Sequence, residues 1–387
     1  MEASWWTRID QLDDEQKDVI SLPITGSHLI VGPPGSGKTN LLLLRAAFLQ
    51  AKGRNNYQIL TFGRVLKEFL VNGTDANNVD PEKIRTYRSW AGDILRDQGV
   101  ELSQDSDFED IREELFNGLS GMSDSDISDH KLDCLLLDEA QDYSPREINL
   151  LMRFCDHVFA AGDGNQAIYR REGALDALRS ICDETKTLSY HYRNGQKICR
   201  LADGIRGIVG RREGLEASSQ YDETAAPSEV ANYASEPLAA QVDRAIPIIA
   251  DQLRAYPNAF IGVLVPLRRD LKEVFSSLSR SYLADNVQLQ MFEAGYAPLD
   301  PERRILVGTV HGAKGLEFRA VHLIAADGIG RFPRHRIRIA YTAVTRAKTS
   351  LAIYNDGALI GQLQDGLSAI SPPSNDVDLG ALFKSGR

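Results

Sequence analysis

The segment GPPGSGKTN (residues 32–40) carries residues whose types and spacing suit the binding of a nucleoside triphosphate. Its glycines let the backbone curl so that N–H groups point at phosphate oxygens. Lys38 can reach the β and γ phosphates, and the Thr39 hydroxyl can ligate Mg²⁺. The candidate nucleotide-binding residues of the loop are Gly32, Gly35, Ser36, Gly37, Lys38 and Thr39. The loop alone leaves the use of the triphosphate open, because kinases, GTPases, transporters and nucleic-acid motors share it.

An acidic motif follows an apolar run in HKLDCLLLDEAQDYSP (residues 130–145). Such a run is typical of a buried parallel strand whose carboxyl end meets a binding site. Asp138 would hold Mg²⁺ through its water shell, and Glu139 would orient the attacking water. Together with the loop, this motif predicts an ATP-hydrolysing site that uses Mg²⁺.

These residues need a strand, a loop and a helix to position them. The stretch SHLIVGPPGSGKTNLLLLRAAFLQA (residues 27–51) supplies all three in that order, so the positive end of the helix dipole would face the phosphates. A chain of 387 residues is long enough for two or three domains. We therefore expect an α/β protein with parallel sheets.

Composition and charge indicate where the protein is located and which partners it could bind. No stretch approaches the roughly 18 apolar residues of a membrane span, the first residues lack the pattern of a signal peptide, and the four cysteines are widely spaced. These features predict a cytoplasmic protein without a membrane partner. Most of the net charge of −10 lies in residues 101–133, which hold eleven acidic and two basic side chains. The remainder is nearly neutral, and basic clusters such as RFPRHRIR (residues 331–338) could contact phosphates.

The block LLLDEAQD, with the loop before it and further motifs in order, resembles the superfamily 1 helicases of the UvrD/Rep branch from about residue 10 to about residue 355. The resemblance implies two RecA-like P-loop NTPase lobes with parallel sheets. It also implies movement along single-stranded nucleic acid, DNA in the 3′-to-5′ direction, driven by ATP and Mg²⁺.

The resemblance assigns further residues to the nucleotide. Gln16 in LDDEQKDVI would read adenine, Tyr192 in TLSYHYRNGQKI would stack on it, and Glu317 in VHGAKGLEF would lie near the ribose. Arg45 matches another expected nucleotide-site position. The catalytic set implied by the resemblance is Lys38, Glu139, Gln166, Arg193 and Arg346. Arg193 and Arg346 follow the first α/β unit, so a second lobe could bring them across a cleft as arginine fingers, which are worth roughly 10³ to 10⁵ in rate.

The resemblance also assigns residues to the nucleic-acid strand. They are Thr61, Phe62, Arg64, Thr86, Trp90, Tyr169, Arg171 and His311. Two positions depart from the family: Asn40 replaces the usual arginine after Thr39, and Arg171 with Glu172 replaces an aromatic followed by an arginine. The missing aromatic would have been a stacking shelf worth about 1–3 kcal/mol per base.

Segment lengths indicate a chain reduced to its motor core. About 43 residues separate Trp90 from Cys134, and DSDFEDIREELFNGLSGM within them predicts an amphipathic helix rather than an inserted domain. We expect a first RecA-like lobe in residues 1–184, a second in 185–365, and a linker with a C-terminal tail in 366–387, with accessory domains absent or vestigial.

Three functions fit the sequence. The first is an ATP-dependent translocase or helicase on single-stranded nucleic acid. The second is a motor subunit that acts only with a partner such as a nuclease, in repair or phage defence. The third is an ATP-gated clamp that binds nucleic acid without stepping.

Overall fold

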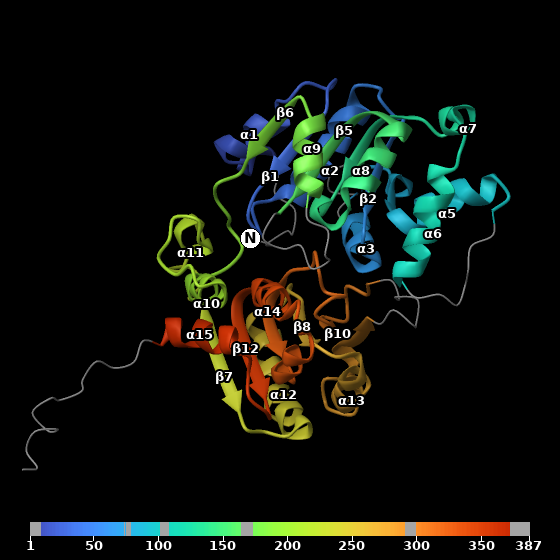
Figure 1. Cartoon of the computed structure of the whole chain (residues 1–387). Coiled ribbons are helices and arrows are strands. Elements are labelled where there is room, and N and C mark those ends of the chain that lie inside the picture. The colour runs from blue at the N-terminus through green and yellow to red at the C-terminus, as the bar shows by residue number, and fades with distance from the viewer. Residues whose placement is uncertain are drawn as a thin grey trace, which may run out of the picture.

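The computed structural model describes residues 9–72, 74, 79–100, 108–163, 173–290 and 299–371. Within these residues the strands form two six-stranded sheets, and every strand pairing in them is parallel. Figure 1 shows the sheets as two lobes, the first coloured blue to green and the second yellow to red. The predicted α/β fold with two RecA-like lobes is confirmed.

The first sheet has the strand order β3-β2-β4-β5-β1-β6. Its strands are β1 (His28–Val31), β2 (Tyr57–Thr61), β3 (Ile84–Thr86), β4 (Leu132–Leu137), β5 (Cys155–Gly162) and β6 (Glu184–Thr187). Because a parallel sheet is covered on both faces, alternate residues of β4 enter different cores. Leu135 and Leu137 join one core, whereas Cys134 and Leu136 join the other.

Most helices of the first lobe begin at a capping side chain or at a glycine. They are α1 (Asp14–Ile20), α2 (Lys38–Ala51), α3 (Arg64–Asn72), α5 (Tyr87–Asp97), α6 (Phe108–Ser120), α7 (Asp124–Asp129), α8 (Pro145–Leu151) and α9 (Ala174–Ile181), with the short 3₁₀ turns η1 (Ile9–Gln11), η2 (Pro81–Lys83), η3 (Ala140–Asp142) and η4 (Met152–Phe154). Helix α8 starts with a capping box, in which Ser144 and Glu147 bond to each other's backbone N–H. Helix α6 is the amphipathic helix that the sequence predicted, with Ile111, Leu115 and Leu119 buried.

The second sheet has the strand order β7-β12-β11-β8-β10-β9. Its strands are β7 (Glu229–Ala234), β8 (Ile261–Val265), β9 (Val287–Gln290), β10 (Ile305–Thr309), β11 (Phe318–Leu323) and β12 (Ala347–Asn355). Its helices are α10 (Gln196–Arg206), α11 (Leu215–Ser218), α12 (Leu238–Ala255), α13 (Arg268–Ser279), α14 (Arg336–Thr345) and α15 (Gly361–Ile370), with η5 (Ala284–Asn286) and η7 (Ala326–Arg331).

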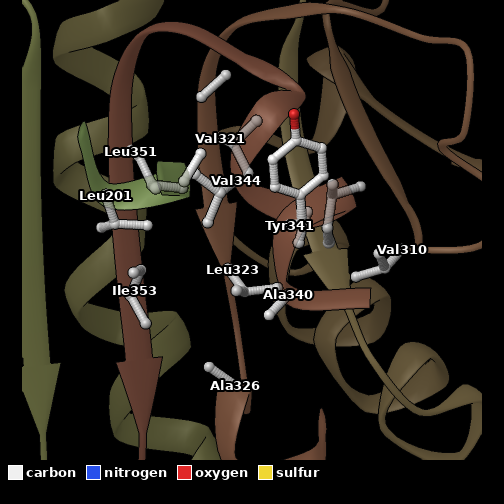
Figure 2. Packing of buried hydrophobic residues seen from close by; sticks show 14 of the residues in the cluster. Leu201, Val310, Val321, Leu323, Ala326, Ala340, Tyr341, Val344, Leu351 and Ile353 are labelled. Atoms are coloured by element: carbon white, nitrogen blue, oxygen red, sulfur yellow. The ribbon is translucent and has the colours of Figure 1, made fainter. Parts of the chain in front are cut away.

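One face of the second sheet is covered by α10 and α14. Figure 2 shows Leu201 of α10 and Tyr341 of α14 among side chains from β11 and β12, including Val321 and Leu351. The opposite face packs on α12 and α13 through residues such as Val242 and Leu271. Both faces of the sheet are therefore buried, as a parallel sheet requires.

Helix α15 extends five residues past the boundary expected at residue 365. It packs against α10 at two glycines, since a Cβ on Gly204 would lie 2.6 Å from the Cα of Gly366. The close approach of the two helices at paired glycines makes α15 part of the second lobe. In the described part of the chain, no helix combines the length and the apolar character that a membrane span needs.

Candidate active site between the lobes

The phosphate-binding loop joins β1 to α2, as predicted. Gly35 and Gly37 have φ of 80° and 84°, a left-handed conformation that glycine adopts without strain. Gly32 is also required, because a Cβ there would lie 2.7 Å from Ser36 Oγ. The Lys38 ammonium donates to the carbonyls of Gly32 and Pro33, both at 2.8 Å. Lys38 thus lies against the inner side of its own loop, at the start of α2.

A hydroxyl and a carboxylate meet beside the loop. Thr39 Oγ1 lies 3.1 Å from Asp138 Oδ2, and Asp138 is only 2% exposed. Burial, and then the neighbouring charge of Glu139, raise the pKa of Asp138 to about 7. A buried carboxylate next to a hydroxyl is a set of hard oxygen donors, which is what Mg²⁺ prefers. The two residues therefore fit the predicted metal role.

Glu139 has an uncommon backbone conformation, with φ 51° and ψ 44°. Its carboxylate accepts a hydrogen bond from the side-chain amide of Gln141 and lies 3.6 Å from the Lys314 ammonium. Burial alone would raise the pKa of Glu139, but the charges of Lys314, Arg346 and Lys38 outweigh it and lower the pKa. Glu139 is therefore an ionised carboxylate, as a group that orients water must be.

The second lobe brings cations to the same place. Arg193 lies against the loop so closely that a Cβ on Gly35 would be 2.4 Å from the Arg193 Cβ. Arg346, at the end of α14, is 1% exposed and donates from Nη1 to the Leu316 carbonyl at 2.9 Å. Burial, followed by the charge of Arg193, lowers the pKa of Arg346 to about 10. Both predicted arginine fingers thus lie in the region where the two lobes meet.

Glu317 is held by two cations of its own lobe. It pairs with Arg193, and its Oε2 lies 2.9 Å from the Lys348 ammonium. Although burial opposes ionisation, these two charges lower the pKa of Glu317 to about 2. The predicted ribose ligand and the first arginine finger are therefore direct partners in this structure.

The predicted adenine-binding residues contact the backbone of the loop. Gln16 donates from its amide to the Ser36 carbonyl at 3.1 Å and forms a capping box with Asp13. Tyr192 donates its hydroxyl to Asp13 at 2.6 Å, and its backbone N–H donates to the Gly35 carbonyl at 3.2 Å. Gln16 and Tyr192 are thus brought together by Asp13, and the Tyr192 ring is 43% exposed.

Arg45 is not part of this group. It lies in α2 seven residues after Lys38, which corresponds to about 10 Å along a helix. Its guanidinium is buried, donates to the Leu22 carbonyl at 2.7 Å and lies 5.3 Å from the centre of the Phe159 ring. In this structure Arg45 fastens the segment after α1 to α2, and its assignment to the nucleotide stays a prediction.

Four residues predicted to contact the strand lie near the carboxyl ends of β2 and β3. Thr61 and Thr86 are opposite each other in the pairing of these strands. Phe62 is half-buried and packs edge-on against Tyr143, with ring centres 4.7 Å apart. Thr86 caps α5, and Trp90 is 4% exposed against Phe154. Phe62 is the one of these four that combines partial exposure with a position at the sheet edge.

The remaining strand-contacting candidates are only partly described. His311 lies in the second lobe beside Phe332, with ring centres 5.6 Å apart, and burial followed by the charge of His335 lowers its pKa. Helix α3 starts at Arg64, whose side chain lies outside the described residues. Gln166, Tyr169 and Arg171 also lie outside the described residues.

An ion pair that the sequence did not predict joins the two lobes. The Lys314 ammonium lies 2.6 Å from Asp142 Oδ1, and the two side chains are 9% and 2% exposed. Asp142 closes the DEAQD motif and Lys314 lies in VHGAKGLEF, so each belongs to a segment already singled out. Their place inside motifs was a usable signal, but nothing in the sequence says which residues of two motifs meet.

Two family models match the chain. An AAA domain model matches residues 16–172, and a UvrD-like helicase C-terminal domain model matches residues 304–354. None of the curated proteins matches the chain. Among solved structures, one described as the structure of PRRSV helicase is 17% identical, with a TM-score of 0.41 over 88% of this chain. This chain covers 54% of that one, or about half its length.

The two models fall on the two lobes in the order in which the motifs occur. The first contains the phosphate-binding loop and the DEAQD motif, and the second contains VHGAKGLEF and Arg346. The chain is thus similar to AAA domains over its first lobe and to the C-terminal domain of UvrD-like helicases over part of its second lobe.

Proposed function

We propose that this chain hydrolyses ATP, with Mg²⁺, in the cleft between its two lobes and uses the cycle to move along single-stranded DNA in the 3′-to-5′ direction. The observation that carries the proposal is the meeting of two sets of side chains. Lys38, Asp138 and Glu139 come from the first lobe, and Arg193 and Arg346 come from the second.

The proposal gives each of these residues a role that its position supports. Thr39 and Asp138 would hold Mg²⁺, which neutralises phosphate charge when bound. Lys38, at the start of α2, would bind phosphate oxygens, and the ionised Glu139 would accept a proton from the attacking water. Arg193 and Arg346 would stabilise the charge that develops on the transferred phosphoryl group.

A cleft built from both lobes also explains how hydrolysis could drive movement. A ligand shifts a conformational equilibrium only through its different affinity for the two states. ATP that contacts both lobes would favour the closed state, and its hydrolysis would release that preference. If both lobes hold one strand, with Phe62 on the first lobe and His311 on the second, alternate closing and opening becomes stepping.

The decisive experiment measures ATP turnover with and without single-stranded DNA, and with single-stranded RNA of the same sequence. Displacement of streptavidin from the 5′ or the 3′ end of the strand then reports movement and its direction. We expect stimulation by the strand and displacement from the 5′ end. Turnover that no strand stimulates would contradict the proposal, and stimulation without displacement would identify a clamp rather than a motor.

A further inference from the structure

Arg112 of α6 occupies an unusual place in the first lobe. It is 4% exposed, although it lies in the stretch of residues 101–133 that holds most of the negative charge of the chain. Its Nη2 donates to Glu147 Oε2 at 2.6 Å and to the Asp142 carbonyl at 2.9 Å. Glu147 is itself 1% exposed and fixed by the capping box of α8. Arg112 therefore has a fixed orientation between α6, α8 and the DEAQD turn.

One face of the Arg112 guanidinium is covered by Phe62. The carbon of the guanidinium lies 4.1 Å from the centre of the Phe62 ring. A cation at this distance over an aromatic face is attracted to the ring. Because the Phe62 ring is half-buried and also touches Tyr143, any ligand that contacts it must act on a packed group.

A chain of contacts also connects Arg112 to the cleft between the lobes. Arg112 binds the carbonyl of Asp142, whose carboxylate binds Lys314, and Lys314 lies 3.6 Å from Glu139 Oε2. Arg112 is thus three contacts away from the carboxylate proposed to activate water. It is also one contact away from a ring at the edge predicted to meet the strand.

We propose that Arg112 is a positioning residue that couples the occupancy of Phe62 by a nucleic-acid strand to the placement of Glu139. The inference rests on the proposed function and adds the route by which the strand controls hydrolysis. A base that contacts Phe62 would favour one orientation of the Phe62 ring relative to the Arg112 guanidinium. Through the Asp142 carbonyl, that arrangement favours one position of the DEAQD turn, and with it of Lys314 and Glu139.

The chain offers a matched control on the same two helices. Arg146 of α8 lies 4.4 Å from the centre of the Phe116 ring and pairs with Glu113 of α6. Like Arg112, it therefore combines a contact with an aromatic ring and an ion pair between α6 and α8. It is half-exposed, and the contacts described for it reach neither Phe62 nor the DEAQD turn. Substitution of Arg146 therefore perturbs the same helix interface without touching the proposed route.

The experiment compares Arg112→Lys with Arg146→Lys. Lysine keeps the charge beside Glu147 but cannot bridge Glu147 and the Asp142 carbonyl with the same planar group. ATP turnover is measured over a range of single-stranded DNA concentrations, and the melting temperature is measured alongside. For Arg112→Lys we expect the stimulation at saturating strand to fall by about fivefold or more, the size of a typical coupling between sites. The strand concentration that gives half of the maximal stimulation should change much less, because in this proposal the strand contacts Phe62 and not Arg112.

A double-mutant cycle tests the route itself. In a Phe62→Leu background, which removes the ring, Arg112→Lys should cause little further loss of stimulation. Because loss of a buried arginine can destabilise a lobe, Arg112→Met combined with Glu147→Gln serves as a second variant. It removes both charges, and glutamine at position 147 can keep the capping box. The same loss of stimulation is expected in this neutral pair.

The outcomes separate the inference from the function on which it rests. If the unmodified protein shows no stimulation by the strand, the proposed function fails. If stimulation is present and Arg112→Lys behaves like Arg146→Lys, or if losses at Arg112 and Phe62 simply add, the coupling role of Arg112 is refuted. A lower melting temperature with an unchanged stimulation ratio would make Arg112 a structural residue only.

Discussion

Replacing Lys314 with methionine removes a cation that joins the two lobes. Its ammonium lies 2.6 Å from Asp142 Oδ1 and 3.6 Å from Glu139 Oε2, and both members of the Lys314–Asp142 pair are buried. Removing one partner of a buried ion pair costs about 3–5 kcal/mol, because the other charge is left uncompensated. The lobes can relieve this cost by separating, which exposes Asp142 to water. We therefore expect the population of the closed arrangement to fall by roughly 10² to 10³-fold or more, since about 1.4 kcal/mol corresponds to a factor of ten.

The size of the effect should depend on pH. Burial raises the pKa of Asp142, and the charge of Lys314 opposes that rise. Without Lys314, the Asp142 carboxyl binds a proton more readily in the closed state than in the open state. A group whose pKa is raised in one state stabilises that state at low pH and loses this effect as the pH rises. The defect of Lys314→Met should therefore be larger at about pH 8.5 than at about pH 6.

The radius of gyration from small-angle X-ray scattering and the rate of ATP turnover provide the measurements. Lys348→Met is the control, because the contact of Lys348 with Glu317 at 2.9 Å stays within the second lobe. Adding Asp142→Asn to Lys314→Met removes the uncompensated charge and should restore most of the compact form. An unchanged radius of gyration and unchanged turnover of Lys314→Met at both pH values would refute the reasoning.

Four further predictions follow from the same site. Lys38→Ala should abolish hydrolysis and weaken nucleotide binding, whereas Glu139→Gln should keep binding and stop turnover; calorimetric titration and phosphate release distinguish the two. Arg346→Ala should lower turnover on the order of 10³-fold with a modest loss of ATP affinity, and unfolding at room temperature would instead show a structural role. Asp138→Asn should raise the melting temperature of the nucleotide-free protein above about pH 7, because it removes a buried charge, while it abolishes Mg²⁺-dependent turnover. The pKa of Glu317 is lowered to about 2, so its ionised form should contribute roughly 3 kcal/mol to the free energy of unfolding above about pH 5. This contribution should be lost as the pH falls towards about 2. Glu317→Gln should remove this pH dependence from acid-unfolding curves.

The sequence predicted those parts of the site that are local in the chain. The phosphate-binding loop, the start of α2 at Lys38 and the acidic end of β4 each depend on neighbouring residues. Their chemistry therefore follows from spacing alone. The amphipathic pattern also predicted α6 correctly, because the helical period depends only on residues within a few turns.

The contacts that sequence could not supply join segments far apart in the chain. Lys314 and Asp142 are 172 residues apart, and both belong to motifs whose roles could be described without reference to each other. Arg112 was not predicted for another reason. The amphipathic pattern identified the apolar face of α6, but it does not show that an arginine beside that face is buried by the packing of α6 on α8. Arg45 shows the opposite case, because its position along α2 matched the family pattern while its guanidinium lies among backbone carbonyls.

Because the backbone of Glu139 is left-handed, selection for stability and selection for activity should favour different residues at position 139. A glutamate at φ 51° and ψ 44° is strained on the order of 1–2 kcal/mol, and glycine would relieve that strain. Glycine would also remove the carboxylate. Libraries of this chain screened for abundance alone should thus accumulate glycine or asparagine at position 139, whereas libraries screened for ATP-dependent work should retain glutamate. A substitution at position 139 that raises the melting temperature would therefore also remove the carboxylate that we propose activates water.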